Sequence, residues 1–283
     1  MEYKSFSNGQ PVPALGLGTW EMGGRQEPDT SRDHYWIDAI KKAIDLGFRH
    51  IDTAEKYGNG NAERLTGHAI KHHPRKDIFL TSKLSARNYR YKDVFRSLNA
   101  SLERLQTGHL DLYLLHEPPE GTPLEETMQA LNEIIDKGLA RMAGVSNFEV
   151  PLLEEALRHA KSPLVTNQVE YNLLVRNRGK LTRNMESEIL PWCHRNGMFI
   201  TAWRPLAKGR LAKEPPPVVR DVAKKYGKTP AQVALRWILD KKDCITIVKA
   251  STEAHMKDDL GALGWKFSQG DMRRLDKAAA GER

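Results

Sequence analysis

The chain has 283 residues, of which 40% are hydrophobic and 28% are charged. This length and composition allow one large buried core, and we expect residues 1–283 to form a single domain. The formal net charge is +8 at pH 7, but lysines and arginines are spread along the whole chain with carboxylates among them. We therefore expect solvated basic loops and no nucleic-acid partner.

The sequence contains no signal for a membrane or for secretion. No stretch reaches the ~18 uncharged residues that span a bilayer, and the first ten residues lack the apolar run and cleavage site of a secretory signal. Cys193 and Cys244 are the only cysteines and have no metal-binding spacing, so we expect both to be buried. We predict a cytoplasmic protein without a disulfide or a metal.

Short apolar or β-branched runs alternate with segments of helical period along the chain. Eight runs are predicted strands: residues 14–20, 49–54, 78–83, 110–116, 142–147, 165–171, 198–203 and 244–249. Apolar residues three and four apart predict helices around residues 37–44, 94–105, 124–135, 152–157 and 233–238, and 271–280 is a further amphipathic stretch. Thr229 and Gln232 predict the start of the fifth helix, because together they can form a capping box.

Eight strands that alternate with helices, without a long linker, predict an α/β protein with a closed (β/α)8 TIM barrel. An open dinucleotide-binding sheet is disfavoured because the first strand is not followed by GxGxxG. In a barrel the carboxyl ends of the strands meet at one rim, which carries the chemistry. Side chains suited to a binding or catalytic site end seven consecutive strands: Asp52, Lys83, His116, Ser146 with Asn147, Gln168, Trp203 and Lys249.

The stretch GFRHIDTAEKYGN places Asp52 at a strand end and Tyr57 on the loop that follows. A tyrosine phenol has a pKa of about 10, and the ammonium of Lys83 would lower that pKa if Asp52 kept the lysine charged. His116 can hydrogen-bond a substrate oxygen that also touches the phenol. Each residue alone has an ordinary structural explanation, but together they predict an acid that protonates a carbonyl oxygen while hydride reaches its carbon. We expect Gly58 to leave room for that substrate.

These motifs resemble those of the aldo-keto reductase superfamily. The segments GFRHIDTAEKYGN, LTSKL, DLYLLH, GVSNF, NQVEYN and IVKAS occur in the order and at the spacing of that family, from LGLGTW to near residue 260. The resemblance implies a short prokaryotic-type reductase that uses NADPH to reduce small aldehydes, ketones or dicarbonyls. It also implies that Tyr57 is the general acid, with Asp52 and Lys83 behind it and His116 orienting the carbonyl.

The resemblance further implies a nucleotide-binding surface on the rim. Ser146, Asn147 and Gln168 would bind the nicotinamide carboxamide. Trp203 would stack on the ring, although it can also be read as a packing residue. Segment 204–210 would follow the pyrophosphate, with Arg210 among its basic residues. The implied cofactor contacts are Thr19, Trp20, Asp52, Ser146, Asn147, Gln168, Trp203, Arg204, Pro205, Leu206, Lys208, Lys249, Ala250, Ser251, His255 and Asp259.

Two departures from the family pattern affect the cofactor and the substrate. His255 stands where many members have an arginine against the 2′-phosphate, so use of NADH stays possible. NADPH is still favoured, because Lys249 is present. Glu117 stands where many members have tryptophan, which makes the pocket more acidic and disfavours a large aromatic substrate. We also expect the long carboxy-terminal substrate loop of many members to be absent, and therefore an open pocket of broad specificity. Its implied lining is Trp20, Tyr57, His116 and Glu117, with ordinary barrel packing as the other reading of Trp20.

Two other functions are compatible with a barrel of this kind. A regulatory protein could bind nucleotide on the same fold with little catalytic activity, and loss of one of the four catalytic candidates would favour it. A metal-assisted hydrolase would need clustered histidine and carboxylate ligands, and the spacing for them is missing. We expect a monomer whose partner is a small carbonyl compound, with no membrane partner.

Overall fold

The computed structural model describes residues 1–179 and 181–279. Eight parallel strands close into a barrel in the order β10-β3-β4-β5-β6-β7-β8-β9. The strands are β3 (Leu15–Gly18), β4 (His50–Asp52), β5 (Phe79–Leu84), β6 (Leu110–Leu115), β7 (Ala140–Ser146), β8 (Leu164–Glu170), β9 (Phe199–Trp203) and β10 (Cys244–Val248). The eight predicted strands and the (β/α)8 barrel are confirmed.

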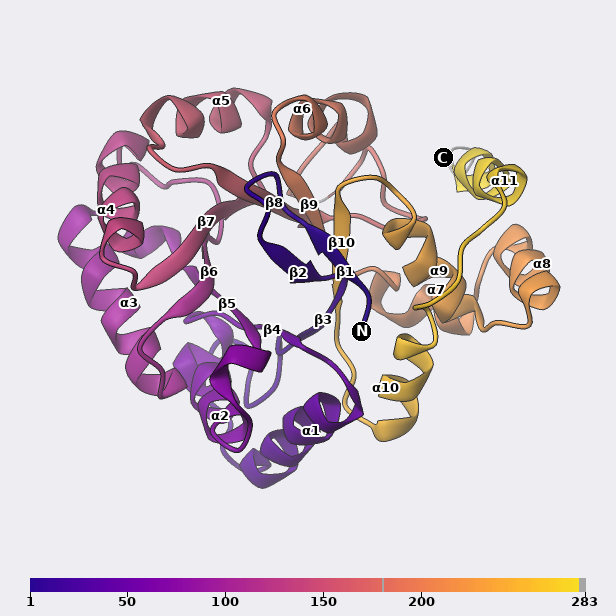
Figure 1. Cartoon of the computed structure of the whole chain (residues 1–283), viewed down its shortest axis with the longest axis horizontal. Coiled ribbons are helices and arrows are strands. Elements are labelled where there is room, and N and C mark those ends of the chain that lie inside the picture. The colour runs from indigo at the N-terminus through magenta and orange to yellow at the C-terminus, as the bar shows by residue number, and fades with distance from the viewer. Residues whose placement is uncertain (180, 280–283) are drawn as a thin grey trace.

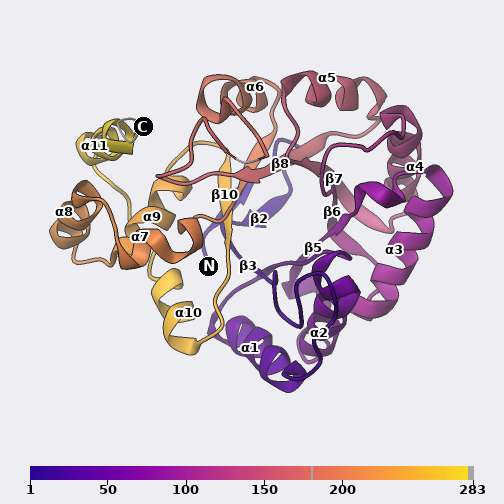
Figure 2. The same ribbon diagram turned by 180° about the vertical axis from the view of Figure 1, so that it is seen from behind.

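Helices surround the barrel, and α8 and α11 lie side by side outside this ring (Figure 1, Figure 2). The α-helices of the described residues are α1 (Asp33–Leu46), α2 (Asn61–Ile70), α3 (Tyr91–Leu105), α4 (Leu124–Asp136), α5 (Val150–His159), α6 (Leu190–Arg195), α7 (Arg210–Lys213), α8 (Pro217–Tyr226), α9 (Pro230–Leu239), α10 (Glu253–Leu260) and α11 (Gln269–Ala279). Over residues 1–179 and 181–279, none is long and apolar enough to cross a bilayer.

The five helices predicted from their apolar period are present as α1, α3, α4, α5 and α9. The capping box of α9 is confirmed, since Gln232 N donates to Thr229 Oγ1 and Thr229 N donates to Gln232 Oε1, both over 3.1 Å. The predicted amphipathic stretch 271–280 falls in α11 up to residue 279, and residue 280 lies outside the described residues.

Helix α2 was not predicted because it buries polar side chains that hide its apolar face. Glu63 is fully buried and its carboxylate accepts from Arg104 of α3 over 2.7 Å. Gly67 lets the two helices approach closely, since a Cβ there would lie 2.4 Å from the carbonyl oxygen of Arg104. The π-helical turn Met185–Ile189 and α6 were likewise not predicted.

A two-stranded hairpin covers the amino end of the barrel and was not predicted from the sequence. Strands β1 (Tyr3–Ser5) and β2 (Pro11–Pro13) have three residues each, too few to show a period, and β2 begins and ends with proline. The hairpin buries Phe6 and Val12 against inward-facing barrel residues, and the rings of Phe6 and Phe199 meet edge to face at 5.1 Å. With one end covered, a ligand has access to the barrel from the carboxyl rim.

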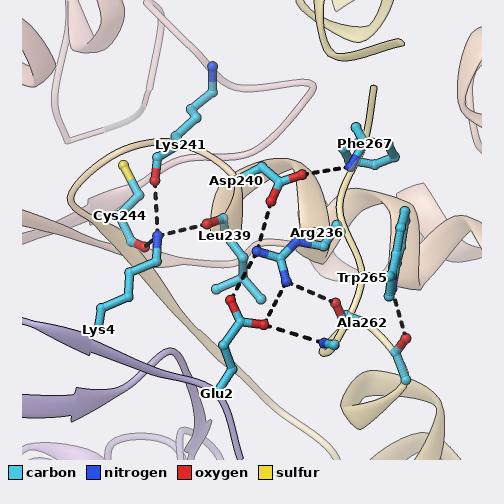
Figure 3. A network of polar contacts seen from close by, with 12 residues as sticks. Glu2, Lys4, Arg236, Leu239, Asp240, Lys241, Cys244, Ala262, Trp265 and Phe267 are labelled. Atoms are coloured by element: carbon cyan, nitrogen blue, oxygen red, sulfur yellow. Dashed lines mark hydrogen bonds and ion pairs between the residues drawn. The ribbon is translucent and has the colours of Figure 1, made fainter. Parts of the chain in front are cut away.

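Residues near the amino terminus also bind the last third of the chain (Figure 3). Lys4 Nζ donates to the carbonyl oxygens of Leu239, Lys241 and Cys244 over 2.7, 3.0 and 2.6 Å. This ammonium satisfies carbonyl groups left open where α9 ends.

Cys193 and Cys244 are both buried, as predicted, and burial raises the pKa of each thiol to about 12.

An ion pair beside Lys4 completes this contact. The Arg236 side chain is 1% exposed, and its guanidinium donates to both carboxylate oxygens of Glu2 over 2.8 and 3.2 Å. It also pairs with Asp240 over 2.9 Å. We call the contacts of Glu2 and Lys4 with α9 and the start of β10 the amino-terminal clamp.

Replacing Glu2 by Gln should destabilise the protein, because it leaves the buried Arg236 charge with one carboxylate partner instead of two. We expect the free energy of unfolding in urea to fall by about 1–3 kcal/mol, since Glu2 is itself partly exposed. Glu120→Gln, at an exposed position, is the matched control and should change it little. Equal effects of the two variants would contradict the role given to the clamp.

Candidate active site

The buried ammonium of Lys83 lies at the centre of the carboxyl rim. Its Nζ atom is 2.5 Å from Asp52 Oδ1, 2.8 Å from the carbonyl oxygen of Thr53 and 3.1 Å from Tyr57 Oη. The Lys83 side chain is fully buried and that of Asp52 is 1% exposed. The structure therefore brings together the carboxylate, the ammonium and the phenol that the sequence analysis grouped.

Strand register and one tight turn create this arrangement. Asp52 ends β4 opposite Thr81 of β5, so Lys83, two residues further along β5, is on the same face of the sheet and nearer the rim. Tyr57 begins the 3-10 turn Tyr57–Gly60. The prediction for Gly58 is wrong: its φ is +54°, and a Cβ there would lie 2.6 Å from the carbonyl oxygen of Gly23. A glycine is required here because the loop of Gly58 lies against the loop of Gly23, and not because a substrate needs the space.

Burial decides the protonation of the phenol. Burial raises the pKa of Tyr57, and the charge of Lys83 lowers it by less, so the pKa lies above its ordinary value. The predicted net lowering is therefore wrong, although Lys83 acts in the predicted direction. Burial lowers the pKa of Lys83, but Asp52 and Tyr57 together raise it above the ordinary value. At neutral pH the phenol thus keeps its proton and the lysine keeps its charge.

Two aromatic rings contact the ring of Tyr57. The ring of His116 meets it edge to face at 5.5 Å and the ring of Trp20 at 4.9 Å. Burial, followed by the charges of Lys83 and Lys56, holds the pKa of His116 well below its usual range, so the imidazole is neutral. Its Nδ1 atom is buried and has no hydrogen-bond partner among the described residues. Trp20 lies at the rim beside the phenol, as its predicted place in the pocket requires.

The residues expected to bind the carboxamide form one hydrogen-bonded group next to Asp52. Ser146 Oγ donates to the carbonyl oxygen of Gln168 over 2.8 Å, and Asn147 Nδ2 donates to Ser146 Oγ over 3.0 Å. Trp203 Nε1 donates to Asn147 Oδ1 over 3.2 Å. The amide of Gln168 donates to Asp52 Oδ2 over 2.8 Å, a link that the sequence did not predict.

The segment after β9 turns sharply and contains three residues in an unusual backbone conformation. Arg204, Ala207 and Lys208 have φ values of 53°, 48° and 58°, in the left-handed region that residues other than glycine rarely adopt. Leu206, with φ −96° and ψ 13°, precedes two of them. The N–H groups of Ala207 and Gly209 donate to the backbone oxygens of Arg204 and Leu206, each at 2.9 Å, so the segment folds as two tight turns. Pro205 is buried in this segment.

Further along the rim, Lys249 is exposed and is paired with an acidic residue that the sequence analysis overlooked. Lys249 Nζ lies 2.9 Å from Glu21 Oε2, and Glu21 also contacts Arg25 over 3.2 Å. Glu21 directly follows Trp20, so its position after the first strand was the available signal. The second overlooked residue is Lys56, which precedes Tyr57.

Helix α10 begins at Glu253, four residues after Lys249. Thr252 caps the helix through a bond from His255 N to its Oγ1 atom over 3.3 Å, and Ser251 precedes it. The His255 side chain is exposed, whereas Ala250 and Asp259 are buried. Burial, and to a lesser degree the charge of Asp258, raises the pKa of Asp259 to about 8.

Comparison with known proteins identifies the family of this chain. The model of the Aldo/keto reductase family matches residues 14–280. The methylglyoxal reductase YeaE of Escherichia coli is 35% identical over 277 residues, which cover 96% of this chain and 93% of that protein. A crystal structure of a thermostable aldo-keto reductase in complex with the inhibitor epalrestat has a TM-score of 0.92 at 41% identity, covering 98% of this chain and 99% of that one. An aldo-keto reductase from Klebsiella pneumoniae, solved in complex with NADPH, has a TM-score of 0.84 at 32% identity, covering 99% and 96%. By both sequence and fold, the chain belongs to the aldo/keto reductase family of oxidoreductases.

Proposed function

We propose that this protein reduces small aldehydes, ketones or dicarbonyls to alcohols with NADPH as the reductant. The observation that carries the proposal is the buried Lys83 ammonium bonded to both Asp52 and Tyr57. A phenol that keeps its proton and has a fixed cation beside it is suited to give that proton to a carbonyl oxygen. The similarity to a methylglyoxal reductase supports small dicarbonyls as substrates.

In this proposal each of four residues has one task. We call Asp52, Tyr57, Lys83 and His116 the tetrad. Bound reduced nicotinamide would supply the hydride that the carbonyl carbon accepts. Tyr57 transfers the proton of its hydroxyl to the carbonyl oxygen, and the Lys83 ammonium at 3.1 Å stabilises the phenolate that remains. Asp52 keeps Lys83 protonated. His116, held neutral, donates a hydrogen bond to the carbonyl oxygen and orients it.

The chain offers groups for each part of the dinucleotide. Ser146, Asn147 and Gln168 present amide and hydroxyl groups next to the tetrad, and Trp203 gives an aromatic face beside Asn147. The left-handed turns of segment 204–210, with its exposed Lys208, fit a pyrophosphate. Lys249 and the amino end of α10 fit a terminal phosphate. Without a guanidinium at position 255, NADH is expected to bind as well, though more weakly.

The proposal is tested by the loss of NADPH absorbance when purified protein is mixed with methylglyoxal, glyoxal and small aldehydes, with NADH in parallel. Oxidation that requires both the protein and the carbonyl compound is the expected result. If nothing is oxidised while NADPH still quenches tryptophan fluorescence, the proposal fails. A regulatory nucleotide-binding protein would then be the better description.

Tyr57→Phe should lower kcat for methylglyoxal by about 100-fold or more, because it removes the proposed proton donor. It should leave the NADPH dissociation constant, measured by fluorescence quenching, within about twofold. Tyr3→Phe makes the same chemical change on the exposed strand β1, remote from the rim, and serves as the control. Near-normal turnover of Tyr57→Phe would remove this residue from the proposed role.

Lys249→Met should weaken NADPH binding about tenfold more than NADH binding, because only NADPH carries the 2′-phosphate that the ammonium would pair with. Glu21→Gln frees Lys249 from its carboxylate partner, so it should strengthen NADPH binding relative to NADH. Dissociation constants of both nucleotides for both variants decide the matter. Equal losses of the two nucleotides in Lys249→Met would contradict the assignment.

A further inference from the structure

A second ion pair stands beside the tetrad, nearer to the solvent. Lys56 Nζ lies 2.9 Å from both carboxylate oxygens of Glu117. The two side chains are 43% and 26% exposed, in contrast to the buried pair of Lys83 and Asp52. Lys56 directly precedes Tyr57 and Glu117 directly follows His116, so the pair joins the two residues that would contact a carbonyl oxygen.

The backbone on both sides of the pair is held by buried contacts. The carboxylate of Glu55, next to Lys56, accepts from the backbone N–H of Ser85 over 2.7 Å. The carbonyl oxygen of Glu117 accepts from the hydroxyl of the buried Tyr89 over 2.6 Å. The backbone of both residues is thus fixed at the rim, while their side chains reach solvent.

Both charges are close enough to act on the tetrad. Burial is the largest influence on the pKa of each catalytic group, but Lys56 further lowers that of His116 and Glu117 further raises that of Tyr57. A charged substrate held by the carbonyl group would meet the same two charges. Because both carboxylate oxygens of Glu117 already contact the Lys56 ammonium, a substrate carboxylate would not find this ammonium free.

We propose that the Lys56–Glu117 pair selects substrates by charge, so that the site takes small uncharged polar carbonyl compounds and disfavours those that carry a carboxylate. A substrate carboxylate would meet the like charge of Glu117 and would have to displace it from Lys56. This proposal rests on the proposed carbonyl reduction and specifies its substrate class.

The test compares succinic semialdehyde with its methyl ester, two aldehydes that differ in the one charge. For the unaltered protein kcat/KM should be higher for the ester. Glu117→Gln leaves the Lys56 ammonium without a carboxylate partner, so the ratio of kcat/KM for the acid to that for the ester should rise about fivefold or more. Lys56→Met leaves the Glu117 charge unbalanced and should lower the ratio.

Two further variants separate this role from a general effect of charge. Lys56→Met combined with Glu117→Gln removes both charges, so neither a free ammonium nor a repelling carboxylate remains, and the ratio should rise less than in Glu117→Gln alone. Glu133→Gln removes a carboxylate that pairs with Lys137 on α4, and it should leave the ratio unchanged. An unchanged ratio in Glu117→Gln, or the same rise in the double variant, would overturn the proposal.

Failure of this inference differs from failure of the proposed function. If the unaltered protein reduces neither the ester nor methylglyoxal, carbonyl reduction itself is in error. The charge effect is then read from the binding of succinate, measured by calorimetry, which Glu117→Gln should tighten about fivefold or more. If the ester is reduced but the ratio does not follow the charges, only the selection by Lys56 and Glu117 is wrong.

Discussion

The site depends on the need of one buried ammonium for three acceptors. An ammonium has three N–H donors, and Lys83 places them on Asp52 Oδ1, the Thr53 carbonyl oxygen and Tyr57 Oη. Because no water reaches this side chain, loss of any acceptor would leave a buried donor unsatisfied. The second oxygen of Asp52 extends the arrangement to Gln168, whose carbonyl oxygen in turn accepts from Ser146 Oγ and from Asn147 N. One desolvated charge therefore fixes both the phenol and the polar group beside it.

Patterns that depend on sequence neighbours could be predicted, whereas those that depend on burial or on distant contacts could not. The strand ends, the apolar period of α3 and α4 and the cap at Thr229 each follow from a few adjacent residues, and the structure has them. Helix α2 was missed because Glu63 is buried with Arg104, a partner 41 residues away. The predicted direction of the Tyr57 pKa shift was wrong for a similar reason. A sequence shows a nearby lysine but not how completely a phenol is desolvated.

Three ion pairs on the carboxyl rim differ in how freely they can exchange partners. Lys83 and Asp52 are closed to solvent, so their contact is part of the fold. Lys249 and Glu21 are each 37% exposed, and Lys56 and Glu117 are 43% and 26% exposed. An exposed ion pair loses little free energy when one member changes partner, because water and a ligand can replace the lost contact. Neither carboxylate of the exposed pairs was among the expected charge partners, since Glu21 and Glu117 meet their lysines only after the barrel closes.

The amino-terminal clamp has a consequence for how the chain folds. Glu2 meets Arg236 across 234 residues of sequence, and Lys4 reaches Cys244 across 240. Contacts of such separation can form only after nearly the whole barrel is assembled, and folding slows as the mean separation of contacting residues grows. The hairpin that covers the amino end of the barrel therefore forms its last contacts only when α9 and β10 are in place. During synthesis, Glu2 and Lys4 would leave the ribosome long before α9 and β10, and could take up their final contacts only after those elements had followed.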